Sequence, residues 1–181
     1  DKLGEKSEEI SIAKYTQALQ GFLQIEPNSK KLKPYVQYRI GKMFCYGLGT
    51  EQDYQKAFEW FERSAKQKNK FAQFSLANLY YYGNGVEKDL PQAFLWYQRS
   101  SSQGQPYAAY SIAQMYRYGE YVTKDNDTAQ RYYKQALSGF LKIESDDMAN
   151  DDLFYKLGQM FKFGLGTDSD VTKAIEYFKR S

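Results

Sequence analysis

The side chains that most often carry out catalysis are scarce in this chain. Its 181 residues include no histidine and a single cysteine, Cys45. Without histidine the chain lacks the usual general base, the partner of serine and cysteine nucleophiles, and the commonest zinc ligand. Cys45 could act as a reactive thiol, but a small, partly buried packing residue is the interpretation we favour. The sequence therefore predicts no catalytic residue and no enzyme.

Two acidic pairs, Asp146-Asp147 and Asp151-Asp152, offer the carboxylate oxygens that hard cations prefer. The pairs lie in a polar connection without the ordered ligand spacing of calcium-binding loops, so we interpret them as a solvated loop. No metal site and no cofactor is predicted. The lone cysteine cannot form an internal disulfide, which favours a reducing compartment and a cytoplasmic location.

Four further aspartates recur at a regular spacing, each a few residues after a glycine turn. The turns are 36 positions apart from Gly47 to Gly83 and on to Gly119, and the last step, to Gly164, is 45 positions. A period of this length is typical of stacked helical repeats. The turns are Gly47-Leu48-Gly49, Gly83-Asn84-Gly85, Gly119-Glu120-Tyr121 and Gly164-Leu165-Gly166, and the aspartates are Asp53, Asp89, Asp125 and Asp170.

The residues between the glycine turns have helical periodicity. Apolar side chains gather on one face before each turn, as at Leu76, Leu79 and Tyr80, and on one face after it, as at Trp96 and Tyr97. Each repeat is therefore predicted to be a helical hairpin whose aspartate caps the second helix. Close packing is predicted where small residues recur, at Gly41, Ala77, Ala113 and Gly158 on the first helices and at Ala57, Ala93, Ala129 and Ala174 on the second.

The repeated pattern resembles the Sel1-like repeat family, a relative of the tetratricopeptide repeats. The family's units look like A-x-Y-x-L-G-x-x-Y-x-x-G-x-G-V-x-x-D-x-x-K-A-x-x-W-Y-x-K-A-A, and Tyr35 to Ser181 follow this pattern in four registers. The resemblance implies an all-α fold, a right-handed α/α superhelix (solenoid) of helix-turn-helix repeats. Tyr121 departs from the pattern by replacing the second glycine of the third turn. Because glycine reaches positive φ at little cost, we expect this turn to take a different backbone path.

We predict one helical-repeat domain over residues 1–181. A second helix near the start has no first helix before it, and the chain stops within another second helix, so we expect a section of a longer array. The oligomeric state stays open. The domain comprises a partial repeat at 8–26 and repeats at about 35–70, 71–105, 106–144 and 149–181.

A larger duplication overlies the repeats. The segment Ala18-Leu-Gln-Gly-Phe-Leu-Gln-Ile-Glu26 returns 118 positions later as Ala136-Leu-Ser-Gly-Phe-Leu-Lys-Ile-Glu144. In each copy it prolongs a second helix and precedes a polar connection, at Pro27–Pro34 and at Ser145–Asp152, and this extension accounts for the 45-residue step. Two interpretations stay open: a change of superhelix curvature or an added side surface, and a neutral insertion.

The charge balance bears on the class of partner. The formal net charge is +3 and the sequence pI about 8.7, with 25 basic and 22 acidic residues. Such a balance falls short of a surface that tracks phosphates, so nucleic-acid binding is disfavoured, with base stacking on exposed tyrosines as its best mechanism. No apolar run has transmembrane length, and no membrane span is predicted.

Recognition of a protein or peptide is the function that remains. On each first helix, positions outside the packing pattern form a stripe at i, i+3 and i+7, and first helices line the concave face in arrays of this kind. The last member of each stripe is aromatic. Two interpretations of these rings stay open: they form a row that contacts a partner, or they pack over the glycine turns and shield them. The stripes are Arg39, Lys42 and Tyr46; Ser75, Asn78 and Tyr82; Ser111, Gln114 and Tyr118; and Lys156, Gln159 and Phe163.

Three functions of different classes were compared. The one we predict is a non-catalytic scaffold that binds a peptide or partner protein through the concave face. The alternative is an accessory nucleic-acid-binding or partner-docking module of a larger bacterial DNA-processing protein, because lengthened Sel1-like arrays resemble segments of plasmid-mobilisation proteins. An enzyme is the third, and the chain lacks both a nucleophile–base pair and the cysteines that staple some relatives.

Overall fold

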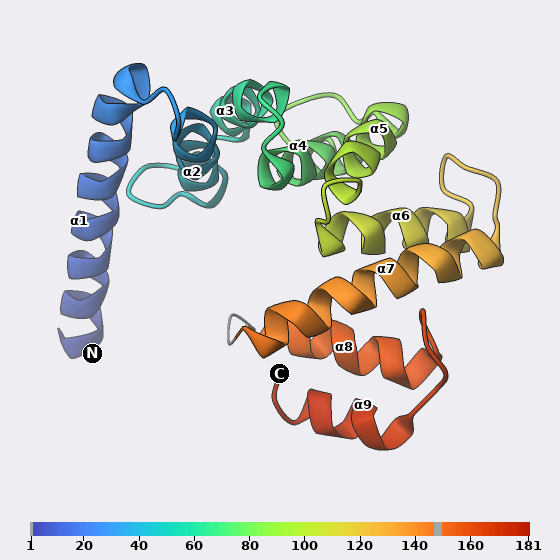
Figure 1. The fold of residues 1–181 in the computed structure, drawn as a ribbon. Helices are drawn as coiled ribbons and strands as arrows, with labels where there is room; N and C mark the ends of the chain where they lie inside the picture. Colours follow the sequence, from blue (N-terminus) through green and yellow to red (C-terminus); the bar gives the residue numbers. More distant parts are fainter. Residues whose placement is uncertain (1, 147–149) are drawn as a thin grey trace. The chain divides into compact units, whose positions relative to one another are not determined.

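The computed structural model describes the backbone of residues 2–146 and 150–181, and the side chains of residues 11–146 and 150–181. Asp147 of the first acidic pair and the start of the last predicted repeat lie outside these residues. The described part is helical and holds no strand, so the all-α prediction is confirmed (Figure 1). The elements in order are α1 (Lys2–Ile25), η1 (Glu26–Asn28), α2 (Lys33–Tyr46), α3 (Tyr54–Lys66), α4 (Lys70–Tyr82), α5 (Leu90–Ser101), α6 (Pro106–Tyr118), α7 (Asn126–Ser145), α8 (Asp151–Phe163) and α9 (Val171–Phe178).

The helices fall into two compact units, Asp1–Trp96 and Tyr97–Ser181. In the first unit α2 packs with α3, and α3 packs with α4, while α1 lies against α2. In the second unit α6 packs with α7 and α8 packs with α9 (Figure 1). Three hairpins, α2–α3, α6–α7 and α8–α9, thus pair a first helix with the second helix that follows it, as the glycine spacing predicts. The single domain over residues 1–181 stays a prediction.

The four recurring aspartates cap second helices, as predicted. The carboxylate Oδ1 of each accepts a hydrogen bond of 2.9–3.0 Å from the backbone N–H three residues later. These hydrogen bonds hold the pKa of Asp53 and Asp170 below the ordinary aspartate value. At Asp125 the hydroxyl of Thr128 lowers the pKa most, and the backbone hydrogen bond adds to the effect. Because the bonds satisfy N–H groups that the first helical turn leaves unpaired, the aspartates fix where each second helix begins.

Glycines end the first helices in the left-handed conformation. Gly47, Gly83, Gly119 and Gly164 have φ between 63° and 75°, and each N–H bonds to the carbonyl four residues back. The second glycine of a turn has another role, because it lies against the backbone of the second helix of the preceding repeat. A Cβ at Gly85 would fall 2.4 Å from the carbonyl carbon of Tyr54, at the start of α3. Only glycine permits this close approach.

The expectation of a different backbone path at Tyr121 is wrong. Tyr121 has a φ of 66°, whereas the glycines at the equivalent positions have φ values of 71°, 68° and 74°. The third turn therefore follows the same left-handed path despite its side chain. A left-handed conformation costs a non-glycine residue about 1 kcal/mol, which the neighbouring helices of the hairpin can impose on a single residue.

In two hairpins, α2–α3 and α8–α9, a glycine on the first helix faces a phenylalanine ring on the second. A Cβ at Gly41 would lie 2.6 Å from Cδ1 of Phe61, and one at Gly158 would lie 2.5 Å from Cε1 of Phe178. In the other two repeats alanine replaces the glycine, and tyrosine replaces the phenylalanine. The predicted close packing is therefore present in the two hairpins that have glycine at this position.

The prolonged second helix α7 moves the next repeat along its length. It has 20 residues against 13 in α3, and the connection that follows it is two residues longer, which together account for the longer repeat. Gly166 packs on Tyr133, the eighth residue of α7, whereas Gly85 packs on the first residue of α3. Seven residues are close to two helical turns, so the docking point shifts by about 10 Å but stays on the same face.

The added turns are part of the packing and not a free insertion. Phe140 on the prolonged part of α7 is fully buried. Glu144 accepts a hydrogen bond of 2.8 Å from the Tyr177 hydroxyl of α9 and pairs with Arg180. Burial and this carboxylate together raise the pKa of Tyr177 to about 12. Together these contacts link the extension to the last hairpin.

Replacing Gly85 by alanine is expected to destabilise the chain by at least about 2 kcal/mol, because the new Cβ would strike the backbone of α3 and strain a positive φ. Gly104→Ala is the matched control: its φ is 75°, but a Cβ there meets nothing within 4 Å. The control should lose only about 1 kcal/mol in urea unfolding. Equal losses in the two variants would contradict the backbone contact.

A triple variant, Asp53→Asn, Asp125→Asn and Asp170→Asn, should lose less stability in acid than the parent chain. Each lowered folded-state pKa means that the cap stabilises the fold above the unfolded value of 3.8, and that this contribution disappears as pH falls through the folded pKa. Asparagine keeps the acceptor without the charge. The measurement is thermal unfolding from pH 6 to pH 3, and parallel curves for the two proteins would refute the assignment.

Candidate functional site

The last residue of each first helix carries an exposed aromatic ring. Tyr46, Tyr82, Tyr118 and Phe163 are 63%, 66%, 62% and 54% exposed. Each ring directly precedes the left-handed glycine that ends its helix, so the chain turns away and leaves the ring in solvent. The residues one turn back, such as Leu79 and Met115, are buried. The turn geometry thus separates this terminal ring from the core.

Three of the four terminal rings have a cation beside them. The Lys42 ammonium lies 5.6 Å from the centre of the Tyr46 ring, and the Lys162 ammonium lies 5.0 Å from that of Phe163. The Arg117 guanidinium is 5.6 Å from the Tyr118 ring. At Tyr82 the neighbour is the edge of Tyr81, with 4.9 Å between the ring centres. Each terminal ring therefore offers an apolar surface, and three of them offer it next to a positive charge.

The polar members of the stripes are less accessible than the rings. Arg39 is exposed, while the other members apart from the rings are half-buried: Lys42, Ser75, Asn78, Ser111, Gln114, Lys156 and Gln159. Lys156 is held by its own unit, because its ammonium donates to Asp152 at 2.8 Å and lies 6.0 Å and 5.8 Å from the rings of Tyr107 and Tyr110. The stripe members of one helix lie together, but they differ in what they can offer a partner.

A groove beside α2 includes residues that the sequence analysis did not single out. It has a volume of about 470 Å³ and lies within the first unit. The stripe residues Arg39 and Lys42 line it, together with Tyr15 and Phe22 from α1 and Tyr35 from α2. The signal in the sequence was the duplication, which places Tyr15 and Phe22 at the positions of Tyr133 and Phe140.

Four segments of the chain, residues 34–69, 70–105, 106–139 and 155–181, match the model of the Sel1 repeat. The chain belongs to the Sel1 repeat family. Sel1 repeat proteins are generally protein-interaction scaffolds, and their repeats form an α/α solenoid. The matched segments follow the predicted repeats closely, apart from the prolonged end of α7 and the start of α8.

Solved structures with Sel1-type repeats are similar to this chain. A Sel1 repeat protein from Oxalobacter formigenes has a TM-score of 0.68 and 26% identity, over 99% of this chain and 67% of that one. The protective antigen c5321 of uropathogenic Escherichia coli, which displays an SLR fold, has a TM-score of 0.64 and 22% identity, over 92% of this chain and 41% of that one. A search of curated protein sequences gives no match. The second likeness supports the fold alone.

Burial shifts the pKa of several phenols and of the single thiol in these Sel1 repeats. Burial raises the pKa of Tyr38, Tyr107 and Tyr110 to about 12, and the Asp152 carboxylate adds to the effect at Tyr107. These phenols therefore stay protonated near neutral pH and cannot serve as bases. Burial also raises the pKa of the Cys45 thiol, which disfavours the reactive thiolate. Asp152, from the second acidic pair, is bound to Lys156 and is not part of a purely solvated loop.

The described residues also show no metal centre and no membrane-spanning element. Over that part of the chain, histidine, cysteine and acidic side chains do not gather in groups of three that could hold an ion. No helix among the described residues combines the length and apolar character needed to cross a bilayer.

Replacing Tyr46, Tyr82 and Tyr118 by alanine is expected to change the free energy of unfolding by less than about 0.5 kcal/mol per residue, because the rings are mostly exposed. Tyr133→Ala is the matched control, since this ring is 2% exposed and should cost about 3 kcal/mol. Urea unfolding gives both values. A loss in the triple variant as large as the control's would assign the rings to packing.

Proposed function

We propose that this Sel1 repeat chain is a non-catalytic scaffold that binds a peptide or partner protein through its first helices, along the concave face that such arrays form. The observation that supports the proposal most directly is the exposed terminal ring, which recurs at one position in all four repeats. A single exposed aromatic residue is ordinary, but four at one structural position of the repeat provide recurring anchors for a partner.

The surroundings of the rings favour a partner that carries both apolar and acidic side chains. Lys42, Arg117 and Lys162 each place a positive charge within 6 Å of a terminal ring. A partner segment with apolar side chains next to carboxylates would satisfy both groups together. The half-buried Gln114 and Gln159 lie one helical turn before Tyr118 and Phe163, where their amides can pair with a partner backbone.

The proposal is tested by capture of partners from the source cell, followed by measurement of affinity with the purified partner. Tyr46→Ala, Tyr82→Ala and Tyr118→Ala combined should weaken that affinity at least about 100-fold, since hot-spot rings contribute upwards of about 1 kcal/mol each. A control variant removes three exposed apolar side chains from second helices, Leu95, Leu141 and Ile175, and should bind as the parent does. Equal affinity of the parent and the ring variant would refute the proposal.

The alternative function is an accessory module in a DNA-processing protein. The salt dependence of binding distinguishes it from the scaffold. The same rings beside cations could stack bases, so a fluorescent oligothymidine is the appropriate probe. Binding that weakens steeply with salt would favour the alternative, because it reports release of counterions from phosphates. Binding to a protein partner with a shallow salt dependence would favour the scaffold.

The absence of enzymatic activity and a cytoplasmic location belong to the same proposal. The protonated phenols and the raised pKa of the Cys45 thiol support the first. The lone cysteine, which cannot pair within the chain, supports the second.

A further inference from the structure

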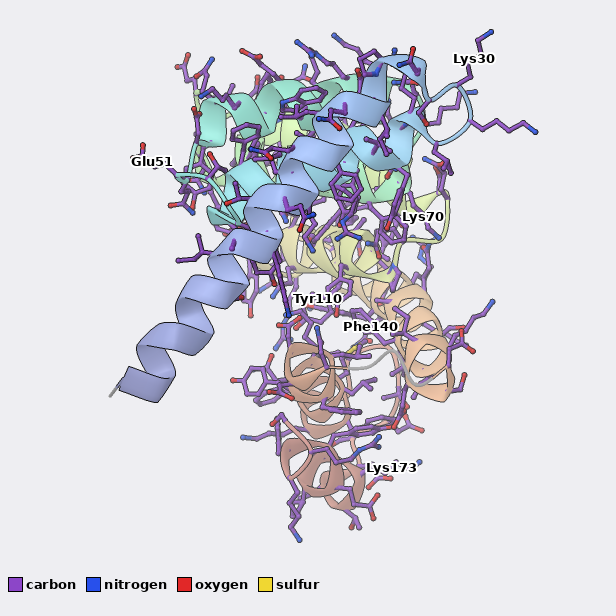
Figure 2. All side chains as sticks on the ribbon, turned by 90° about the vertical axis from the view of Figure 1, so that its left-hand side faces the viewer. Lys30, Glu51, Lys70, Tyr110, Phe140 and Lys173 are labelled. Atoms are coloured by element: carbon purple, nitrogen blue, oxygen red, sulfur yellow. The ribbon has the colours of Figure 1, made fainter. Side chains whose placement is uncertain are left out.

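Two lysine-rich connections share one edge of the first unit. One leads from α1 and η1 into α2, and the other joins α3 to α4. Figure 2 shows Lys30 and Lys70 on the same side of this unit, and Glu51, from a glycine turn, on the opposite side. The residues that we name the lysine edge are Lys30, Lys31, Lys33, Lys66, Lys68 and Lys70.

Hydrogen bonds hold the two connections together. The Asn69 amide, at the end of one connection, donates to the Pro34 carbonyl, at the end of the other, at 3.3 Å. The Gln67 amide donates to the Gln37 side chain at 2.6 Å, and the Gln37 amide donates to the Glu26 carboxylate at 2.6 Å. This chain of side chains crosses from α3 through α2 to η1. The fold therefore fixes both groups of lysines on one edge.

Most of the positive charge on this edge is not neutralised within the described part of the chain. Lys33 lies 3.8 Å from Glu26, and Lys66 pairs with Glu62 at 2.8 Å. Six lysines against two glutamates leave a formal charge of +4, which exceeds the net charge of +3 of the whole chain. The exposed lysines that form no ion pair with a described carboxylate are Lys30, Lys31 and Lys68.

The second unit builds the corresponding connections without these lysines, so the fold does not require them. Its exposed Asn150 and Asp151 follow a complete hairpin, α6–α7, which makes the exposure of this edge a property of the repeat. The aligned residues are Asn150 for Leu32 and Asp151 for Lys33, and Ser102, Gly104 and Pro106 for Lys66, Lys68 and Lys70.

Lys68 has a backbone conformation that favours glycine. Its φ is 65°, and the φ of the aligned Gly104 is 75°. This left-handed conformation costs a lysine free energy that a glycine does not lose. Lys68 thus places an exposed positive charge at a position where the fold alone favours glycine.

A leucine lies within the lysine edge. Leu32, between Lys31 and Lys33, is 62% exposed. An exposed leucine beside cations suits a surface that has an apolar layer beneath anionic groups. The cations of the edge are all lysines, whose compact charge on a flexible stem lacks the rigid fork of arginine. Such side chains suit mobile lipid headgroups better than the fixed carboxylates or phosphates of a folded partner.

We propose that the lysine edge, together with Leu32, binds the surface of a bilayer that contains anionic phospholipids. The ammonium groups lie among the anionic headgroups, and Leu32 reaches the boundary between headgroups and acyl chains. The terminal rings of this unit, Tyr46 and Tyr82, are at the opposite ends of α2 and α4. The inference therefore goes beyond the proposed function and does not depend on those rings.

Cosedimentation with vesicles of phosphatidylcholine and phosphatidylglycerol in equal amounts measures this binding. The full chain should bind these vesicles and not vesicles of phosphatidylcholine alone, and added salt should weaken the binding. The variant Lys30→Gln, Lys31→Gln and Lys68→Gln should bind about 100-fold more weakly, because each lysine at an anionic surface contributes about fivefold. No binding by the parent chain, or equal binding to both kinds of vesicle, would overturn the proposal.

A second triple variant controls for net charge. Lys124→Gln, Lys134→Gln and Lys179→Gln remove three exposed lysines of the second unit and change the net charge equally. This control should bind the vesicles as the parent does. If the two triple variants lose the same affinity, the binding reflects overall charge, and the lysine edge is not a site.

The variant Lys68→Gly separates binding from folding. It relieves the left-handed strain, so the variant should unfold at a higher temperature than the parent. It should also bind the vesicles about fivefold more weakly, because one lysine is lost. Leu32→Asn, which introduces the residue of the second unit, should weaken binding without a change of charge. Vesicle binding that neither substitution weakens would refute the proposal.

Soluble polyanions distinguish the bilayer from other anionic partners. Polyglutamate and a fluorescent oligothymidine should bind at least about tenfold more weakly than the vesicles, because neither offers an apolar layer to Leu32. Equally tight binding of either would assign the edge to an acidic polypeptide or to nucleic acid and overturn the bilayer. The Tyr46, Tyr82 and Tyr118 triple alanine variant should bind the vesicles as the parent does, so failure of the scaffold proposal and failure of this one are separable.

Discussion

Neighbouring repeats within each unit depend on one contact, in which a turn glycine lies against the backbone of the second helix of the preceding repeat. Three such contacts are present, at Gly49, Gly85 and Gly166, and in each a Cβ would fall within 2.4 Å of backbone atoms. The turn is also tied by hydrogen bonds, since the Gln130 side chain donates to the Gly164 carbonyl and accepts from the Gly166 N–H. Thr16 donates to Gly49 in the same way. Because backbone meets backbone, a side chain at any of these three glycines would clash.

The proposed interaction surface depends on the same turns. The left-handed glycine ends each first helix and leaves the preceding ring in solvent, while the aspartate a few residues later starts the second helix. In the hairpins α2–α3 and α8–α9 a glycine faces a phenylalanine ring at a distance that leaves no room for a Cβ. The abundant tyrosines thus divide into buried phenols that fill the core and exposed rings at the turns.

Much of this could be predicted from the sequence, because glycine, aspartate and small residues act locally. The caps at Asp53 and Asp170 and the left-handed turns needed only their spacing. Tyr121 was the error, since the rule that only glycine takes positive φ ignores the force that a completed hairpin exerts on one residue. The uses of Arg39 and Lys156 could not be told apart from the stripe pattern. Their difference arises one turn earlier, where Tyr35 stands in place of Asp152. The groove was not predicted because Tyr15 and Phe22 lie on a second helix, whereas the stripes comprise residues of first helices only.

The prolonged helix α7 has a consequence for how such chains can diversify. Its seven added residues rotate the docking position by only about 20° while carrying it two turns further on. An insertion of that length therefore changes the distance between adjacent hairpins but keeps the contact between them. Shorter additions of five or six residues would rotate the glycine contact by about 120–140°, onto another side of the helix. In solenoids of this kind, an insertion of seven residues in a second helix therefore increases the distance between neighbouring hairpins and keeps the same helix face at the contact.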